Sequence, residues 1–277
     1  MRYERRESLR RLAALGAAGA LPGCGLLAPR ERLNIVLVHG GYHGPWCWEK
    51  LVPLLRGEGH EVSAPELPGR GADSTPFEKI DAAAYAKAVI DVLDAQRTPA
   101  VVVGHSSSGL VVSRAAEARP ERIRTLVFLS GFVMRDGEAW RPGQDPGTKV
   151  TPVLRVDFRP GTKIPAQTRI DVSNPDAVKL AFYNDCSDAD ARAAIARLVP
   201  EPPRPLGEPL RLTAQRFGGV DKVYVFCAKD NAVSPKHQQG FAAKWPMRRT
   251  ITLESGHSPF LSMPERLAQV LGGELSA

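Results

Sequence analysis

Cysteine is scarce in this chain, and its spacing forms no recognisable framework. Four cysteines occur in 277 residues, and Cys47, Cys186 and Cys227 lie far apart without a C-x-x-C pair. Such spacing does not predict a disulfide scaffold. An oxidising compartment would permit one bridge, and the sequence favours no particular pairing. Cys227 lies in an apolar run, so we expect it to be buried.

Glycine-rich nucleotide motifs and clustered basic residues are also missing. Neither a G-x-G-x-x-G pattern nor a P-loop occurs, so no nucleotide cofactor is predicted. The formal charge is +7, but beyond residues 1–23 the Lys and Arg residues are scattered among acids. No basic block is interleaved with aromatic residues, which argues against nucleic acid as a partner. His39 and His43 share a glycine-rich loop with no acid between them, so no metal site is predicted.

Residues 1–30 resemble an export signal and linker. Arg5-Arg6 precedes an apolar stretch from Leu12 to Leu21 that is too short to anchor the chain across a bilayer. This pattern is similar to a bacterial twin-arginine export signal. Leu21-Pro22-Gly23-Cys24 resembles a lipoprotein cleavage box, in which Cys24 would carry a lipid anchor. The alternative is cleavage nearby, with Cys24 incidental. We therefore expect a periplasmic protein or a membrane-anchored lipoprotein.

From residue 33 onward, short apolar runs alternate with helical patterns. Near-continuous apolar strands between helices predict an α/β fold, with a parallel sheet covered on both faces. The expected strands are Leu33–Val38, His60–Ala64, Ala100–Val103, Ile123–Leu129, Val223–Cys227 and Thr250–Leu253. The expected helices are Trp46–Arg56, Ile80–Gln96, Gly109–Ala118, Lys236–Trp245 and Pro264–Leu271.

The alternation stops between Phe132 and Phe217. This stretch is rich in proline, glycine and charge, with helical patterns at Ala177–Tyr183 and Asp188–Leu198. A structureless loop of that length is unusual in a compact domain. We therefore expect residues 133–217 to form a cap, inserted between the core segments 31–132 and 218–277.

Ser106 follows an apolar strand and precedes a helix, in Gly104-His105-Ser106-Ser107-Ser108. This layout is typical of a nucleophile elbow, which holds a serine on a tight strand-to-helix turn. The usual pattern is G-x-S-x-G, and here Ser108 replaces the second glycine. Ser107 is a rival nucleophile, but that register would put the bulky His105 where the elbow has space only for a small residue. We therefore favour Ser106.

An acid and a histidine follow in the order expected for a Ser-Asp-His triad. Asp230 and His257 each come just after a predicted strand, as Ser106 does. Parallel strands bring such positions to one edge of the sheet. We expect Ser106 to be the nucleophile, His257 the general base and Asp230 the group that orients the histidine. Asp221 is a rival acid.

An oxyanion hole needs two backbone N–H groups near the nucleophile. The first predicted donor is Ser107, which follows the nucleophile at the start of a helix. The second is Gly41, in the loop after the first strand. Four aromatic residues of the cap region could form the walls of an apolar substrate pocket or simply pin the cap to the core. They are Phe132, Trp140, Phe182 and Tyr183.

Several blocks resemble the plant methylesterase and hydroxynitrile lyase family and its bacterial esterase relatives. They are Val36–Trp48, Ala181–Ser187, Arg216–Val220 and Gly256–Leu261, in order along the chain. The resemblance implies an α/β-hydrolase fold, with a mostly parallel six-stranded sheet, helices on both faces, a small cap and no metal. The family's lyases carry Thr at the position of Gly40 and Lys at that of Ser258, so the resemblance points to the esterase branch.

The sequence thus predicts a serine carboxylic-ester hydrolase that acts on small esters through an acyl-enzyme and needs no cofactor. Two alternatives stay open: a hydroxynitrile lyase-type carbon–carbon lyase, and a ligand-binding protein on a hydrolase scaffold. The acyl and alcohol groups of the substrate and the oligomeric state are not readable from the sequence.

Overall fold

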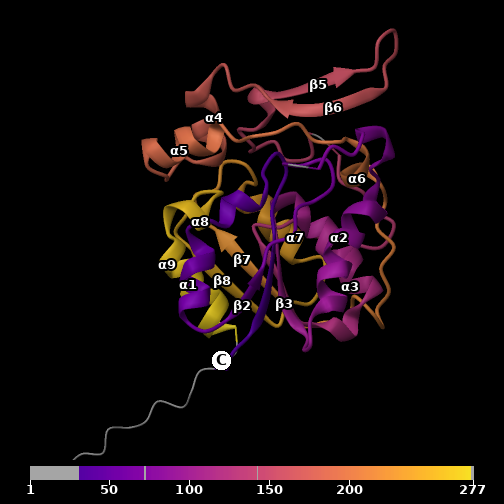
Figure 1. The fold of residues 1–277 in the computed structure, drawn as a ribbon. Helices are drawn as coiled ribbons and strands as arrows, with labels where there is room; N and C mark the ends of the chain where they lie inside the picture. Colours follow the sequence, from indigo (N-terminus) through magenta and orange to yellow (C-terminus); the bar gives the residue numbers. More distant parts are fainter. Residues whose placement is uncertain (1–30, 72, 142, 276–277) are drawn as a thin grey trace, which may run out of the picture. The chain divides into compact units, whose positions relative to one another are not determined.

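A computed structural model describes residues 31–71, 73–141 and 143–275 (Figure 1). The predicted export signal, including Arg5-Arg6 and Cys24, lies outside the described residues. None of the described helices combines the length and the apolar character needed to cross a membrane.

Six parallel strands form the central sheet, in the order β2-β1-β3-β4-β7-β8. The order reverses beside β1 and β3, and ligands in open α/β sheets bind outside the carboxyl ends of strands at such a switch point. The six apolar runs of the sequence correspond to these six strands, which confirms the predicted fold class. The bounds are β1 Asn34–Val38, β2 Glu61–Ser63, β3 Ala100–His105, β4 Ile123–Leu129, β7 Lys222–Cys227 and β8 Arg249–Leu253.

Helices cover both faces of the sheet (Figure 1). On one face, α2, α3 and α7 bury an apolar cluster that includes Val89, Val112 and Phe241. On the other face, α1, α8 and α9 bury a second cluster around Leu51 and Phe260. The helix bounds are α1 Leu51–Gly57, α2 Ala82–Ala95, α3 Gly109–Ala118, α7 Pro235–Ala242, α8 Pro259–Ser262 and α9 Pro264–Gln269.

The predicted helix Trp46–Arg56 is in fact two elements. A 3-10 turn spans Pro45–Trp48, and α1 begins only at Leu51. Proline has no backbone N–H, so Pro53 is tolerated only within the first turn of a helix, where that N–H needs no helical partner. Pro53 therefore forces α1 to begin within three residues before it. The last predicted helix also ends early, because α9 gives way to a π-helical turn at Val270–Glu274.

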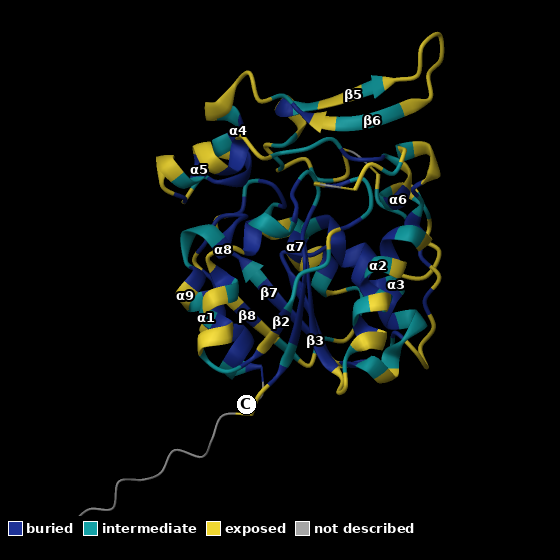
Figure 2. Ribbon diagram, in the orientation of Figure 1, coloured by how far each residue is buried: buried dark blue, intermediate teal, exposed yellow. Residues whose placement is uncertain are grey.

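The segment 133–217 contains two helices near those expected, a short third helix and a hairpin that was not predicted. The helices are α4 Pro175–Phe182, α5 Asp188–Ile195 and α6 Arg204–Gly207, and the hairpin strands are β5 Leu154–Phe158 and β6 Pro165–Ile170. A third apolar cluster, with Val153, Val178 and Ala194, holds the root of the hairpin against α4 and α5. The tip of the hairpin is exposed (Figure 2).

Polar contacts join this segment to the loops that follow β7 and β8. The amide of Asn184 donates to the carbonyl of Lys229 at 2.9 Å, and that of Asn231 donates to the carbonyl of Leu180 at 2.9 Å. The Ser258 hydroxyl donates to the carbonyl of Phe182 at 2.8 Å. The C-terminal end of α4 is therefore fixed over the part of the sheet edge where Asp230 and His257 lie.

Candidate active site

Ser106 occupies a strained turn at the end of β3. Its φ of 54° lies in the left-handed region, which residues other than glycine seldom adopt, whereas Ser107 has no positive φ. The N–H of Phe132 donates to the Ser106 carbonyl at 2.9 Å and holds this turn against the chain leaving β4. Backbone strain of this kind costs about 1–3 kcal/mol and is concentrated at functional sites. The elbow geometry therefore singles out Ser106.

Close packing around the elbow explains the residues on either side of Ser106. A Cβ atom added to Gly104 would lie 2.5 Å from a methyl of Val112, so glycine is required there. Ser108 fits where the usual motif has glycine, because its buried hydroxyl lies 2.8 Å from the carbonyls of both Val38 and His105. The hydroxyl can donate to either one, and the departure from the motif leaves no buried polar group unpaired.

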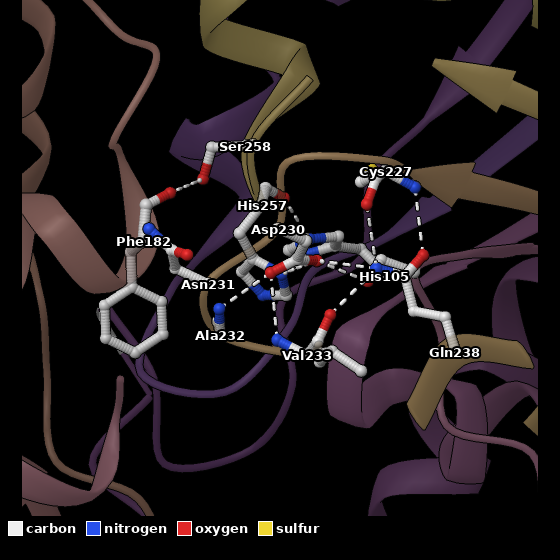
Figure 3. Close-up of polar contacts among 12 residues, drawn as sticks. His105, Phe182, Cys227, Asp230, Asn231, Ala232, Val233, Gln238, His257 and Ser258 are labelled. Atoms are coloured by element: carbon white, nitrogen blue, oxygen red, sulfur yellow. Dashed lines mark hydrogen bonds and ion pairs between the residues drawn. The ribbon is translucent and has the colours of Figure 1, made fainter. Parts of the chain in front are cut away.

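Asp230 and His257 form a buried hydrogen-bonded pair (Figure 3). The Asp230 Oδ2 atom accepts from Nδ1 of His257 at 2.7 Å and from the Ser130 hydroxyl at 2.6 Å. Its Oδ1 atom accepts from the N–H groups of Ala232 and Val233 at 2.7 and 2.9 Å. A carboxylate held by this many donors stays oriented toward the histidine. Asp230 lies in the loop that follows β7, which ends at Cys227.

The rival acid Asp221 lies elsewhere. It precedes β7, at the opposite end of that strand from Asp230, and its side chain is 61% exposed. Its carboxylate lies 3.6 Å from the guanidinium of Arg248. Asp221 is therefore a surface ion-pair residue with no access to His257.

His105 links the elbow to His257. Its Nε2 donates to the backbone carbonyl of His257 at 2.9 Å, and the two imidazole centroids lie 4.5 Å apart. Burial, followed by the nearby histidines, lowers the pKa of His105 well below its ordinary value, so the ring is neutral. Within the described part of the chain, no hydrogen bond joins the Ser106 hydroxyl to the His257 ring. Catalytic hydrogen bonds are often long without substrate and tighten when it binds.

Gln238 on α7 frames the Asp230 loop and was missed by the sequence analysis. This fully buried amide accepts from the N–H of Cys227 at 2.9 Å and donates to the carbonyls of Cys227 and Val233 at 3.0 and 2.8 Å. It therefore ties the end of β7 to the turn that presents Asp230. Ser130 was missed as well, and its only sequence signal is its position directly after the apolar run of β4.

Two buried histidines orient the loop that contains Gly41. His39 Nδ1 donates to the carbonyl of Gly40 at 3.0 Å, while its Nε2 accepts from the N–H of Leu67 at 3.4 Å. His43 Nδ1 donates to the carbonyl of Gly41 at 2.7 Å. In a trans peptide the N–H points away from the preceding carbonyl. Because His39 binds the Gly40 carbonyl, the Gly41 N–H points away from His39.

The same histidines are held neutral by burial. Desolvation lowers the pKa of His39 to about 3 and that of His43 to about 4. Neutral His43 can donate from Nδ1 and accept at Nε2, where the Tyr183 hydroxyl lies 2.7 Å away. Tyr183 follows α4, so the segment 133–217 contributes directly to the geometry of this loop.

Gly41 and Ser107, the two predicted oxyanion donors, lie together. A Cβ atom added to Gly41 would be 3.3 Å from the Ser107 hydroxyl and 2.7 Å from Oε2 of Glu201. Glu201 comes from the cap segment and is 2% exposed. Its other oxygen pairs with the buried guanidinium of Arg70 at 2.6 Å. The structure thus places a neutralised ion pair against the predicted oxyanion loop, a feature that sequence reasoning did not anticipate.

The four aromatic residues predicted to line a pocket fall into two pairs. Phe132 stacks on Trp140 with ring centroids 5.5 Å apart, on the side of α7. The Phe182 ring lies 5.9 Å from the His257 ring, on the side of α4. Tyr183 is fully buried with its hydroxyl on His43, so it supports the loop from behind.

A cavity of about 830 Å³ lies beside α7. Met134, Ser234, His237 and Phe241 contribute to its lining, whereas Ser106, Asp230 and His257 do not. Phe241 also packs on Phe132, with ring centroids 5.2 Å apart. Phe132 therefore stands between this cavity and the elbow.

Metal and disulfide chemistry find no support in the described residues. No group of three His, Cys, Asp or Glu side chains in that part of the chain is placed to hold a metal ion. Cys47, Cys186 and Cys227 are free and buried. Burial raises the pKa of all three thiols, that of Cys186 to about 12, so none of them is an activated nucleophile.

Comparisons with known proteins agree with this arrangement. A model described as the alpha/beta hydrolase family matches residues 35–270. Methylesterase 9 of Arabidopsis thaliana is 28% identical over 251 residues, which cover 86% of this chain and 96% of the relative. Putative methylesterase 11 of the same plant is 28% identical over 253 residues, and here the chain spans only 63% of the relative's length. A crystal structure of a methylesterase from Arabidopsis superposes with a TM-score of 0.76 at 25% identity, covering 88% of this chain and 99% of that one.

Proposed function

The chain belongs to the alpha/beta hydrolase family, and we propose that it hydrolyses small carboxylic esters with Ser106 as the nucleophile. This confirms the family expected from the sequence blocks. The proposal rests mainly on one arrangement: the strained turn at Ser106 lies beside the buried Asp230–His257 pair. The hydrogen bond from His105 to the His257 carbonyl connects the turn with this pair. Relatives named methylesterases support the same reaction class.

The reaction would proceed in two halves. His257 Nε2 accepts the Ser106 proton while the hydroxyl oxygen bonds to the ester carbonyl carbon. The bond between the carbonyl carbon and the alkoxy oxygen then breaks, and the protonated histidine gives its proton to the departing alkoxide, which leaves as an alcohol. The acyl group stays on the Ser106 oxygen as an acyl-enzyme. Water enters, loses a proton to His257 and releases the acid, which restores the Ser106 hydroxyl. Asp230 holds Nδ1–H throughout and so keeps Nε2 available.

Negative charge on the carbonyl oxygen would be stabilised by the N–H groups of Gly41 and Ser107. Removing one such donor from a hydrolase costs about 10²–10³ in rate. Both donors are backbone groups, so side-chain substitution cannot delete them. His39 and His43 act as positioning residues, because they hold the carbonyls on either side of the Gly41 N–H.

The residues around the site favour ester hydrolysis over carbon–carbon lyase chemistry. Gly40 offers no hydroxyl, and a Cβ atom there would lie 3.0 Å from Cβ of Ser106. Ser258 follows His257 but carries no charge, and its hydroxyl donates to the Phe182 carbonyl. Ser258 therefore cannot supply a cation that would stabilise a leaving cyanide anion.

We further propose that the substrates are small, largely apolar esters, with methyl esters as the first class to examine. The Phe182 ring lies 5.9 Å from the His257 ring, and the backbone N–H of Phe132 bonds to the Ser106 carbonyl, so aromatic residues near the site favour apolar groups. The relatives' names support the methyl group on the alcohol side.

The test is ester hydrolysis by the wild type and by Ser106→Ala. Esters varied separately in the acyl and alcohol groups should be hydrolysed by the wild type, and Ser106→Ala should retain less than about one part in 10³ of kcat. Ser107→Ala is the matched control, because it keeps the backbone N–H, and it should retain most activity. Full activity in Ser106→Ala would overturn the proposal, and cyanide release from mandelonitrile would point to the lyase instead.

A further inference from the structure

The exposed apolar side chains of this protein are concentrated in one segment. Among the described residues, every large apolar side chain that is well exposed lies between residues 150 and 185. They are Val156, Phe158, Ile164, Val172 and Leu180, with exposed fractions of 38% to 54%. Isolated exposed apolar residues are common on protein surfaces, whereas a local concentration marks an interaction site.

The β5–β6 hairpin explains why two of these residues, Val156 and Phe158, are exposed. In its antiparallel register, Leu154 lies opposite Ile170 and Val156 lies opposite Thr168, so these side chains share one face. At the root of the hairpin this face is covered, because Ile170 is buried against the cap cluster. Toward the tip this cover is lost, and Val156 and Phe158 are exposed. Figure 2 shows the turn that joins the two strands as exposed.

The tip also carries two positive charges without ion-pair partners. Nearer the root, Arg155 pairs with Asp171 at 2.8 Å and Arg169 pairs with Asp157 at 3.0 Å. Arg159 and Lys163 are exposed, and no ion pair joins either of them to the described residues. The segment from Phe158 to Pro165 contains no acid. It therefore combines two half-exposed apolar side chains with two unpaired cations.

Hydrogen bonds fix the shape of this tip. The N–H of Arg159 donates to the carbonyl of Ile164 at 2.9 Å, and the N–H of Thr162 donates to the carbonyl of Arg159 at 3.0 Å. The N–H of Ile164 donates to the Thr162 hydroxyl at 3.1 Å. Gly161 supplies the positive φ of 71° that the turn needs. The apolar and charged groups are thus preorganised, which lowers the entropy cost of binding.

We propose that the hairpin tip binds the surface of an anionic lipid membrane. Phe158 and Ile164 would enter the boundary between headgroups and acyl chains, while Arg159 and Lys163 would contact the lipid phosphates. A second copy of this chain is a poor partner, because two such tips would bring four cations together. Each basic residue near an anionic surface contributes about a five-fold change in binding, so the association would be weak and reversible.

The experiment is co-flotation of the full chain with vesicles, in a Cys24→Ser background that cannot be lipidated at that residue. Mixed phosphatidylcholine–phosphatidylglycerol vesicles should bind the protein more strongly than phosphatidylcholine alone, and added salt should weaken the binding. Phe158→Ser/Ile164→Ser should abolish most of it. Arg159→Gln/Lys163→Gln should reduce binding to the anionic vesicles by about 25-fold, at five-fold for each cation.

The matched control is Val172→Ser/Leu180→Ser, which removes two equally exposed apolar side chains outside the tip. It should bind vesicles like the parent, and thermal unfolding should show that all variants are folded. The proposal is overturned if the control loses as much binding as the tip variants, or if the tip variants bind like the parent. It is also overturned if the parent binds neither vesicle, or if the tip substitutions instead dissociate a dimer in sedimentation.

Discussion

One carboxylate oxygen of Asp230, Oδ2, accepts two hydrogen bonds, from Nδ1 of His257 at 2.7 Å and from the Ser130 hydroxyl at 2.6 Å. Two N–H groups of the following turn occupy the other oxygen. All of the carboxylate's strong donors come from the ends of β4, β7 and β8, and none comes from the cap. The core therefore sets the orientation of the Asp230 carboxylate, whereas the residues on either side of His257 also bond to the segment 133–217.

Replacing Asp230 with Asn should lower kcat by about 10³–10⁴ while leaving the fold intact, because the amide permits the wrong histidine tautomer. Ser130→Ala removes only one of the donors to the carboxylate and should cost about ten-fold, within the range of a single hydrogen bond. Both values come from steady-state ester hydrolysis at neutral pH. Asp221→Asn is the control, and activity loss in that variant comparable to Asp230→Asn would contradict the assignment of the acid.

Removing one partner of the Arg70–Glu201 ion pair should lower the free energy of unfolding far more than replacing both partners with apolar residues. Arg70→Met leaves an unpaired carboxylate in a buried site, which typically costs about 3–5 kcal/mol of unfolding free energy. The double variant Arg70→Met/Glu201→Leu removes both charges and should recover most of that loss. Urea denaturation of the two single variants and the double variant forms the cycle that measures the coupling.

The same cycle has a catalytic readout. Glu201 Oε2 lies against Gly41, so a naked carboxylate there would oppose the negative charge of the oxyanion. We expect kcat of Arg70→Met to fall further than kcat of the double variant, with similar KM values. Equal kcat values in folded single and double variants would mean that the ion pair does not act on the oxyanion loop.

Stability should fall in mild acid because of the buried histidines. Burial lowers the pKa of His39 to about 3 and of His43 to about 4, from an ordinary 6.5, and it also lowers the pKa of His105. Between pH 6.5 and 4 the unfolded chain binds protons that the folded chain does not. The free energy of unfolding is therefore not reduced by these histidines above pH 6.5. Below that pH it declines as the pH falls, by up to about 1.4 kcal/mol per pH unit for each histidine.

Urea midpoints measured at several pH values across this window check the prediction. His43→Gln removes one of the three buried histidines. The slope of its unfolding free energy against pH should therefore be smaller than that of the wild type, by the amount that corresponds to about one bound proton. Identical slopes for the two proteins, or wild-type stability that rises as the pH falls, would show that His43 is not held neutral.

We propose that residues 1–30 direct export and that Cys24 carries a lipid. Replacing Arg5-Arg6 with two lysines should retain the full-length chain in the cytoplasm of a bacterial host, because the export machinery reads the twin arginine. Cys24→Ser should release the exported chain from the membrane fraction. Cell fractionation and mass measurement of the mature N-terminus follow both changes. Cleavage away from Cys24, without a lipid, would leave the export proposal standing and refute lipidation.

The parts of this molecule that follow from local patterns could be predicted from the sequence. Apolar runs such as those of β3 and β4 are buried on both faces of a parallel sheet, so their composition alone identifies them. Ser106, Asp230 and His257 each follow such a run, and parallel strands carry these positions to one edge. Helix boundaries were less accurate, because the effect of Pro53 depends on its position within the first turn.

Features that depend on tertiary contacts could not be predicted. The β6 strand begins with Pro165 and has three polar residues in succession, Gln167 to Arg169, so it resembles a loop until its pairing with β5 is known. Gln238 looks like an ordinary surface residue of a helix, and only the fold shows it buried against Cys227. Glu201 likewise has no sequence signal that connects it with Arg70, 131 positions earlier, or with Gly41.

Covalent labelling can identify which serine of this protein is the nucleophile. A fluorophosphonate ester reacts with an activated serine and leaves a stable adduct, which peptide mass mapping can locate. We expect one adduct on Ser106, its persistence in Ser107→Ala, and its loss in Ser106→Ala and in His257→Ala. An adduct on Ser107, or labelling that survives in Ser106→Ala, would show that Ser106 is not the nucleophile.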